Sequence, residues 1–421
     1  MQKLLVSLRN VLYRYFFQQF NCSIALNVYV RALAFVFVAA IGSILFQYSD
    51  LILSDIVPDV ATMKSSYLYL NVFRFISPLY FKFLLWVGLL LSLLLIIGCF
   101  PFWVLLYNVI IYSSLLVMFP TFMSFQWDIL LIEITIFSLL FISPKILFVS
   151  PKQHYRVSWI QLLPIILLIV RLFYHSAVVK FLSKDPLWLS MSALDIHLFS
   201  QPMPHLLSYY FHSFVIKHNL SAPFLWVMFL IEFLIAFMIL IPTYRRIAAV
   251  VLILFQCSII FTGNYGFFNF LTIVMLLIPL LVSYDHARIR LTQSFKFLLL
   301  PILVIITLNS FFMIPKPKQS LPILTSVFKR LVIGNNYGLF ASMTRNQTRY
   351  QVSISSNGLT WKPLKFHYFD QLGFPTLSFV QPYHPRIRWQ LWFKFLGLES
   401  YPKWYRKFVK QMAKDPNQLS T

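Results

Sequence analysis

Charged side chains inside long apolar segments are the residues of this chain most able to carry chemistry. Asp128, Arg171, Lys180 and Glu232 all lie within or at the edge of such segments. A lysine in these surroundings can act as a base or bind an anion, so the four residues could form a membrane-embedded catalytic site. The substrate would be a lipid or a quinone, with Lys180 as the base. The structural alternative is that Lys180 extends to the lipid headgroups, that Asp128 caps its own helical turn, and that Glu133 pairs with a base from another segment.

A second set of polar residues could form a client-binding pocket or a structural cluster above the apolar segments. Asp128 and Glu133 are five residues apart, about 140° around a helix, so they do not form an obvious acid–base pair. Asp128 could instead cap its own helical turn. Asn264 and Asn269 flank two glycines in a segment typical of a tight turn. The full set is Gln126, Asp128, Glu133, Asp185, His197, Gln201, Asn264 and Asn269.

Metal and cofactor chemistry find no support in the sequence. The histidine spacings match no zinc signature, and the cysteines at 22, 99 and 257 fit no metal site. The chain has no Walker A motif, no dinucleotide-binding glycine pattern, no HExxH and no Gly-x-Ser-x-Gly. We therefore expect no metal and no cofactor, and the sequence favours a non-enzymatic function over an enzymatic one.

Composition places all of these residues in a membrane protein. The 421 residues are 59% hydrophobic and 11% charged, whereas soluble globular proteins carry about 25% charged residues. From Phe83 to Trp127 the chain has no Asp, Glu, Lys or Arg. A soluble domain of this kind would precipitate, so we expect a multi-pass membrane protein. A cytosolic enzyme, a secreted disulfide scaffold and a porin are excluded.

The predicted fold is an all-α polytopic membrane bundle of about nine transmembrane helices. Residues 1–30 are expected to form an amphipathic N-terminal segment, and residues 31–318 the bundle, with a large loop at 183–222. The loop is too apolar for a solvated linker. The expected spans are 31–49, 80–98, 101–120, 127–147, 158–182, 223–242, 246–262, 265–283 and 297–315.

The distribution of basic residues predicts the orientation. With the N-terminus in the cytoplasm, the inside loops hold pairs or triples of basic residues, for example Arg245 and Arg246. The loop 183–222 and the C-terminal domain then face outward. We expect a bacterial inner membrane protein with a periplasmic C-terminal domain; the alternative is the endoplasmic reticulum membrane, with that domain in the lumen.

Residues 319–421 are expected to form a small extracytoplasmic β unit and a terminal amphipathic helix. Residues 350–354 and 360–368 are predicted strands, and 389–412 a helix with an aromatic face. Residues 315–421 contain 16 basic and 3 acidic residues, a net charge of +13. In a membrane-tethered domain this charge indicates anionic lipid headgroups rather than nucleic acid as the partner.

Four residues form a C-terminal signature: Arg386, Trp389, Gln390 and Trp392. We predict that the planar guanidinium of Arg386 joins the β unit to the bundle, bidentate to a carboxylate or stacked on an indole. The alternative is an arginine that binds headgroups. Trp389 and Trp392 are expected to be exposed, where they could cover apolar patches of a client protein.

These motifs, in this order, resemble the lipase maturation factor family over about residues 30–412. The resemblance rests on short sequence blocks: Phe125-Gln-Trp-Asp128 with Glu133; Arg171, Lys180, Asp185 and Trp188; His197, Gln201, Pro202 and Pro204; Gly263 to Asn269; Asn335, Tyr337 to Phe340, Met343 and Thr344; and Pro382, Pro385, Arg386, Trp389, Gln390, Trp392 and Phe393. The chain departs from the family pattern at Phe199, Ser353 to Ser355, Tyr383 and Arg388.

The resemblance implies a membrane-bound chaperone that assists the folding or assembly of exported proteins, with lipase-like clients. The animal members are endoplasmic reticulum proteins needed by secreted lipases. The bundle is also distantly similar to the membrane domain of vitamin K-dependent gamma-carboxylases, whose lysine base would correspond to Lys180. That similarity supports only the enzymatic alternative.

Overall fold

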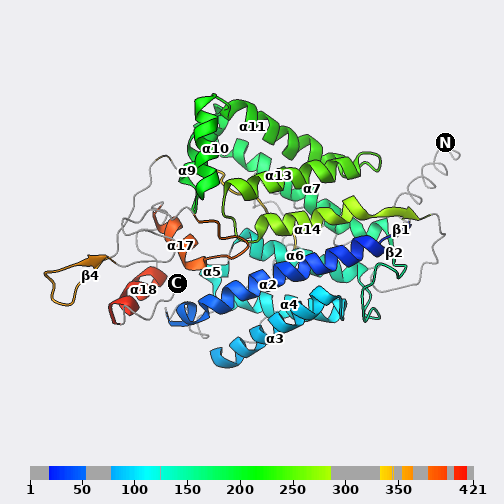
Figure 1. Ribbon diagram of the computed structural model, residues 1–421, viewed down its shortest axis with the longest axis horizontal. Helices are drawn as coiled ribbons and strands as arrows, with labels where there is room; N and C mark the ends of the chain where they lie inside the picture. The colour runs from blue at the N-terminus through cyan, green and yellow to red at the C-terminus, as the bar shows by residue number, and fades with distance from the viewer. Residues whose placement is uncertain are drawn as a thin grey trace, which may run out of the picture.

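The computed structural model describes residues 19–53, 77–123, 125–285, 332–343, 345, 353–363, 378–395 and 403–414. Helices make up most of this part of the chain and run roughly side by side along the long axis (Figure 1). Their sequences are almost wholly apolar, so they bury their surfaces against one another and against lipid. The protein is a multi-pass membrane protein.

Long helices form the bundle in chain order: α2 (Ser23–Leu53), α3 (Pro78–Ile97), α4 (Pro101–Met118), α6 (Gln126–Phe141), α7 (Trp159–Leu182), α11 (Ser221–Leu230), α13 (Arg245–Thr262) and α14 (Phe268–Leu281). Five helical segments are long and apolar enough to cross a membrane: Ser23–Ser49, Leu79–Ile97, Trp159–Leu182, Ser221–Met238 and Arg245–Thr262. Pro101–Leu116 and Phe268–Leu281 are shorter apolar helices. The predicted span 297–315 lies outside the described residues, so the expected number of nine stays a prediction.

Local sequence signals set several helix ends. Proline occupies the first position of α3 and of α4. A backbone N–H at this position would have no acceptor within the helix, so the missing N–H of proline does not weaken it. Gly98 ends α3 in the left-handed region, at φ 109°. A β-carbon there would lie 3.0 Å from both Arg31 and the carbonyl oxygen of Val149. Ser158 and Gln161 form a reciprocal capping box at the start of α7.

One end of the bundle carries a small sheet that the sequence did not predict. Strands β1 (Gln19–Asn21), β2 (Arg156–Ser158) and β3 (Ser283–Asp285) pair in the antiparallel order β2-β1-β3. They join the N-terminal ends of α2 and α7 to the C-terminal end of α14. Because α2 begins at Ser23, residues 23–30 belong to the first span and not to an N-terminal surface segment as predicted. Residues 1–18 lie outside the described part.

The other end carries the loop 183–222 together with the C-terminal segments (Figure 1). The loop folds into α8 (Pro186–Leu189), α9 (Leu194–Ser200) and α10 (Leu206–Lys217). Short helix α5 (Pro120–Met123) precedes α6 at this end. Strands β4 (Ser353–Ile354) and β5 (Lys362–Pro363) form a hairpin that projects away from the bundle. The remainder of the predicted second strand lies outside the described residues.

The helix expected over 389–412 is described in two parts, and residues 396–402 between them lie outside the described residues. These are α17 (Arg386–Phe395) and α18 (Lys403–Lys414). The sequence between them contains Gly397 and Pro402, both poor helix formers. On α18, Trp404 and Phe408 are buried, and the Trp404 ring packs edge-on against Phe122 of α5, 5.6 Å between centroids.

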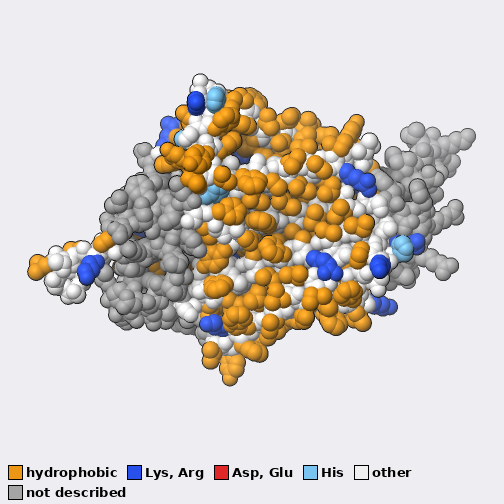
Figure 2. Space-filling view, viewed as in Figure 1, with side chains coloured by type: hydrophobic (Ala, Val, Ile, Leu, Met, Phe, Trp, Pro, Cys, Tyr) orange, Lys and Arg blue, Asp and Glu red, His pale blue; other side chains and the backbone are white. Residues whose placement is uncertain are grey.

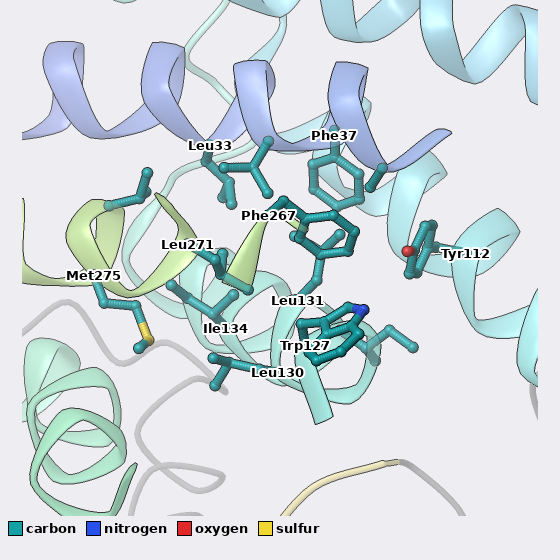
Figure 3. Packing of buried hydrophobic residues seen from close by; sticks show 14 of the residues in the cluster. Leu33, Phe37, Tyr112, Trp127, Leu130, Leu131, Ile134, Phe267, Leu271 and Met275 are labelled. Atoms are coloured by element: carbon teal, nitrogen blue, oxygen red, sulfur yellow. The ribbon is translucent and has the colours of Figure 1, made fainter. Parts of the chain in front are cut away.

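The core lies where α2, α4, α6 and α14 meet. Figure 3 shows their side chains interlocking around Trp127, which is 1% exposed. Phe37 of α2 packs edge-on against Tyr112 of α4, with 6.2 Å between ring centroids. This dry core places the polar residues of α6 beside the C-terminal segments.

Candidate functional site

The first feature at the loop-bearing end is a fully buried ion pair between α6 and α17. Arg386 Nη1 donates to Asp128 Oδ2 and Arg386 Nη2 donates to Asp128 Oδ1, each at 2.7 Å. Both side chains are 0% exposed. Tyr112 also donates to Asp128, and Arg386 Nη1 donates to the Phe122 carbonyl. The bidentate contact predicted for Arg386 is confirmed, whereas the alternative in which Asp128 caps its own turn is wrong.

A second buried carboxylate, Glu133, gathers four donors. Arg171 Nη2 lies 2.5 Å from Glu133 Oε1, which also accepts from the Gly334 amide at 2.8 Å. The Tyr337 hydroxyl donates to Oε2 at 2.5 Å, and Asn335 Nδ2 at 3.3 Å. Arg171 also lies over the Tyr337 ring, 5.5 Å from its centroid. One carboxylate of α6 therefore holds both α7 and the C-terminal segment 332–340.

Several bundle side chains bind the backbone of this same segment. Gln126 accepts from the Gly338 amide at 2.8 Å and donates to its carbonyl at 2.9 Å. His175 Nδ1 accepts from the Tyr337 amide at 3.2 Å, and Asp185 Oδ2 accepts from the Met343 amide at 2.8 Å. A buried segment without regular secondary structure needs such partners, because its peptide groups would otherwise have no hydrogen bonds. These contacts explain why polar residues stand at fixed places in apolar helices.

The segment 378–386 is held in the same way. Asn264 Oδ1 accepts from the Val380 amide at 2.9 Å, and Asn264 Nδ2 donates to the Ser378 carbonyl at 2.9 Å. Gln47 of α2 donates to the His384 carbonyl and accepts from the Arg386 amide, both at 2.8 Å. Sequence reasoning missed Gln47. The signal that could have found it is a polar amide near the C-terminal end of a 27-residue apolar span.

Gln201, Tyr265 and His197 form a further polar group between the loop and α14. The Tyr265 hydroxyl donates to Gln201 Oε1 at 2.8 Å and lies 3.1 Å from His197 Nε2. The His197 ring packs edge-on against Phe340, 4.5 Å between centroids. Burial, assisted by the charge of Lys180, lowers the pKa of His197 to about 4. The ring is therefore neutral at pH 7.

Lys180 and Glu232 make the third buried ion pair, which faces a cavity. Lys180 Nζ lies 2.8 Å from both Glu232 oxygens, and its charge lies over the Trp188 ring, 5.4 Å from the centroid. Glu232 is in the π-helical turn η3 (Ile231–Ile235), which continues into α12 (Ala236–Met238). Such turns are frequent at functional sites. The adjoining cavity has a volume of about 670 Å³.

The four residues of the enzymatic alternative do not share that cavity. Lys180 and Glu232 line it, but Asp128 and Arg171 do not, and both are fully buried in the other two ion pairs. The prediction that all four converge is therefore wrong. Lys180 is 6% exposed, so the reading in which it extends to the headgroups also fails. In the described part of the chain, no group of three His, Cys, Asp or Glu residues could hold a metal ion.

The C-terminal signature is buried rather than displayed. Trp389 is 2% exposed and packs edge-on against Trp127, 4.9 Å between centroids. The predicted exposure of Trp389 is therefore wrong, because α17 turns its aromatic face inward. Gln390 donates to the Thr121 carbonyl, and half-buried Trp392 donates to the Ser200 carbonyl at 3.3 Å. Asn269 lines the cavity instead of joining the backbone contacts.

Family models match most of the chain in two parts. Residues 24–286 match a lipase maturation factor transmembrane domain, and residues 333–420 match a lipase maturation factor C-terminal domain. The two matches correspond to the bundle and to the segments that dock onto it.

Several curated proteins are similar to the chain. Lipase maturation factor 1 of Mus musculus is 27% identical over 357 residues, which is 74% of this chain and 60% of the mouse protein. The Bos taurus protein is 26% identical, over 78% of this chain and 64% of its own length. Lipase maturation factor 2 of Gallus gallus is 32% identical over 39% of this chain and 23% of its own length. The chain thus spans less than two thirds of these relatives, and no solved structure matches it.

Proposed function

Because the chain belongs to the lipase maturation factor family, we propose that it is a membrane-bound maturation factor that binds exported proteins while they fold, with lipase-like proteins as clients. The names of the similar proteins support this role. The observation that carries the proposal is that the loop 183–222 and the C-terminal segments join at one end of the bundle. Trp188 donates to the Phe340 carbonyl at 2.9 Å, and Trp392 donates to the Ser200 carbonyl.

The β4–β5 hairpin is the element at this end that we expect to contact the client. Its connecting residues expose Leu359 by 85% and Trp361 by 63%. Figure 2 shows hydrophobic atoms at the tip of this projecting hairpin. Large apolar side chains exposed together mark surfaces that bind other proteins. Partly folded clients expose complementary apolar surface, to which Leu359 and Trp361 would bind.

The test uses the full chain, co-expressed with an exported lipase in cells that lack their own copy. We expect the enzymatic activity per amount of exported lipase protein to fall when the chain is absent. The double variant Leu359→Ser/Trp361→Ser should lower it as well, at an unchanged amount of the chain in the membrane. Ser356→Ala, in the same exposed turn, is the matched control.

Two results would contradict the proposed role or the assignment of the hairpin. If activity per amount of protein stays the same without the chain, for the lipase and for other exported hydrolases, the chain is not their maturation factor. If only the hairpin variant has no effect, the client contact lies elsewhere and the assignment of the hairpin is wrong.

A further inference from the structure

The cavity beside Lys180 lies between helices that face the membrane. Its walls come from α7, α11, η3, α13 and α14, from the loop helices α8, α9 and α10, and from Leu339 and Phe340 of the C-terminal segment. Three residues on its rim, Val227, Leu254 and Phe261, are 52%, 64% and 59% exposed. They lie on two candidate membrane spans, and Figure 2 shows this face of the molecule covered by hydrophobic side chains. The medium that reaches the opening is therefore lipid rather than water.

The lining of the cavity has a large apolar part and a smaller polar part. Most of the lining is apolar, with aromatic and branched side chains such as Phe255, Ile259 and Phe224. A volume of about 670 Å³ falls within the roughly 300–1,000 Å³ of small-molecule sites. Apolar contact alone selects nothing from a bilayer, because lipid tails are as apolar as the wall. Selectivity must come from the polar part of the lining.

That polar part carries no net charge. Lys180 and Glu232 neutralise each other, and the neighbouring His197 is neutral because its pKa is lowered to about 4. Gln256 and Asn269, which are 5% and 1% exposed, belong to the same part, together with the uncharged side chains of Ser176, Ser258, Thr262 and Tyr265. Among the described residues, Gln256 Oε1 and Asn269 Nδ2 have no hydrogen-bond partner. Buried polar atoms of native proteins nearly always have one.

We infer that this cavity binds an uncharged acylglycerol, a membrane lipid that carries a free hydroxyl and an ester. The hydroxyl donates to Gln256 Oε1, and an ester or hydroxyl oxygen accepts from Asn269 Nδ2, after small rotations about the terminal torsions of the two amides. The acyl chain lies along the apolar wall toward the rim. A phosphate or a free carboxylate would be disfavoured, because Lys180 is already neutralised by Glu232.

The π-helical turn η3 contributes Glu232 to the polar part of the cavity lining. It widens one turn of the span 221–238 and places Glu232 against Lys180 of α7. The inference does not depend on the proposed client role, since lipid binding is measured with no client present. Either one can fail while the other stands.

The experiment uses the full chain in phosphatidylcholine nanodiscs. The probe is a monoacylglycerol with a diazirine in its acyl chain. After irradiation, mass spectrometry should place the label on residues of α11 and α13 that line the cavity. Unlabelled monoacylglycerol should compete at least tenfold better than phosphatidylglycerol or a free fatty acid. Equal competition by all three, or better competition by an anionic lipid, would overturn an uncharged ligand.

Variants of α13 test whether the lipid binds in this cavity. Ser258 is exposed and lines the cavity, so Ser258→Trp should fill it and lower labelling at least fivefold. Val250→Trp is the matched control, because Val250 is 43% exposed on the same helix but does not line the cavity. If Ser258→Trp does not fold, Val227→Trp at the rim replaces it. Equal labelling of cavity-filling and control variants would refute the site.

The last variant tests the polar part. Gln256→Leu removes the acceptor while keeping a similar volume, so competition by monoacylglycerol should weaken about tenfold, the effect of one hydrogen bond. Competition by the fatty acid should not change. Unchanged competition by monoacylglycerol would show that Gln256 does not recognise the headgroup, and would overturn the assignment of the ligand.

Discussion

Arg386 and Asp128 are 258 positions apart in the chain, yet their side chains meet in a bidentate contact that is fully closed to solvent. This contact fixes the C-terminal helix α17 to the start of α6. Tyr112 donates to Asp128 and the Phe122 carbonyl accepts from Arg386, whereas Arg386 Nε has no hydrogen-bond partner among the described residues. The described segments 332–343 and 378–395 are therefore packed against the bundle.

Replacing Arg386 by Lys should destabilise the docked C-terminal segments. Lysine lacks the planar fork, so it cannot reproduce the two parallel hydrogen bonds that Arg386 makes to the two oxygens of Asp128. Breaking a buried ion pair outright costs about 3–5 kcal/mol, and we expect a loss of up to that size. Limited proteolysis and thermal unfolding in detergent measure it. Arg406→Lys, on the exposed face of α18, is the control; equal protease resistance of Arg386→Lys and wild type would refute the role of the contact.

Adding one methyl group at Gly338 should loosen the segment 332–343. A β-carbon there would lie 2.7 Å from Val179 Cγ1 of α7. Such overpacking costs about 1–3 kcal/mol. Val179→Ala should restore space, so the double variant should lose less stability than the two single variants added together. Gly42→Ala has no atom within 4 Å of the new carbon, and because alanine is favoured over glycine inside a helix it should not destabilise the protein. Simple additivity of the two changes would contradict the close approach.

His384 should make stability depend on pH. The ring is 0% exposed between Phe125 and Trp127, and neither ring nitrogen has a partner among the described residues. Burial, followed by the charge of Arg386, lowers the pKa of His384 well below its usual value. The unfolded chain binds a proton at His384 near pH 6.5, whereas the folded protein does so only at a lower pH. The contribution of neutral His384 to the free energy of unfolding is therefore complete above about pH 6.5 and is lost as the pH falls.

The measurement is thermal stability between pH 5 and pH 7. One proton accounts for at most about 1.4 kcal/mol per pH unit. His384→Phe keeps an aromatic ring and should flatten the dependence, whereas His154→Phe at an exposed site should not. An identical slope in wild type and His384→Phe would show that another group is responsible.

The proposed orientation can be tested by glycosylation in a eukaryotic membrane. Asn346-Gln-Thr348 is a sequon in the segment expected outside, and Asn21-Cys-Ser23 is one at the end expected in the cytoplasm. Asn21 is in β1, in the sheet at the opposite end from the loop 183–222. We expect a glycan on Asn346 that Asn346→Gln removes, and none on Asn21. A glycan on Asn21 would mean that the orientation is inverted.

The composition and the residue types predict the membrane class, the positions of several helices and most of the polar residues that make the buried contacts. Uncharged stretches such as 83–127 leave no alternative to burial in lipid or protein. Because a guanidinium makes planar, bidentate contacts, the residue type predicted that Arg386 would bind a carboxylate or stack on an indole, and the structure shows the carboxylate. The family resemblance came from the same residues.

Only the tertiary structure decided which partner each of these residues takes. Asp128 and Glu133 stand five residues apart on α6, but one binds Arg386 and the other binds Arg171 and the segment 332–340. Lys180 meets Glu232 across 52 positions, through a π-helical turn that no hydrophobic pattern reveals. Trp389 is buried because α17 packs inward. Periodicity reports which face of a helix is apolar, whereas the identity of a partner depends on long-range packing that is not encoded in local spacing.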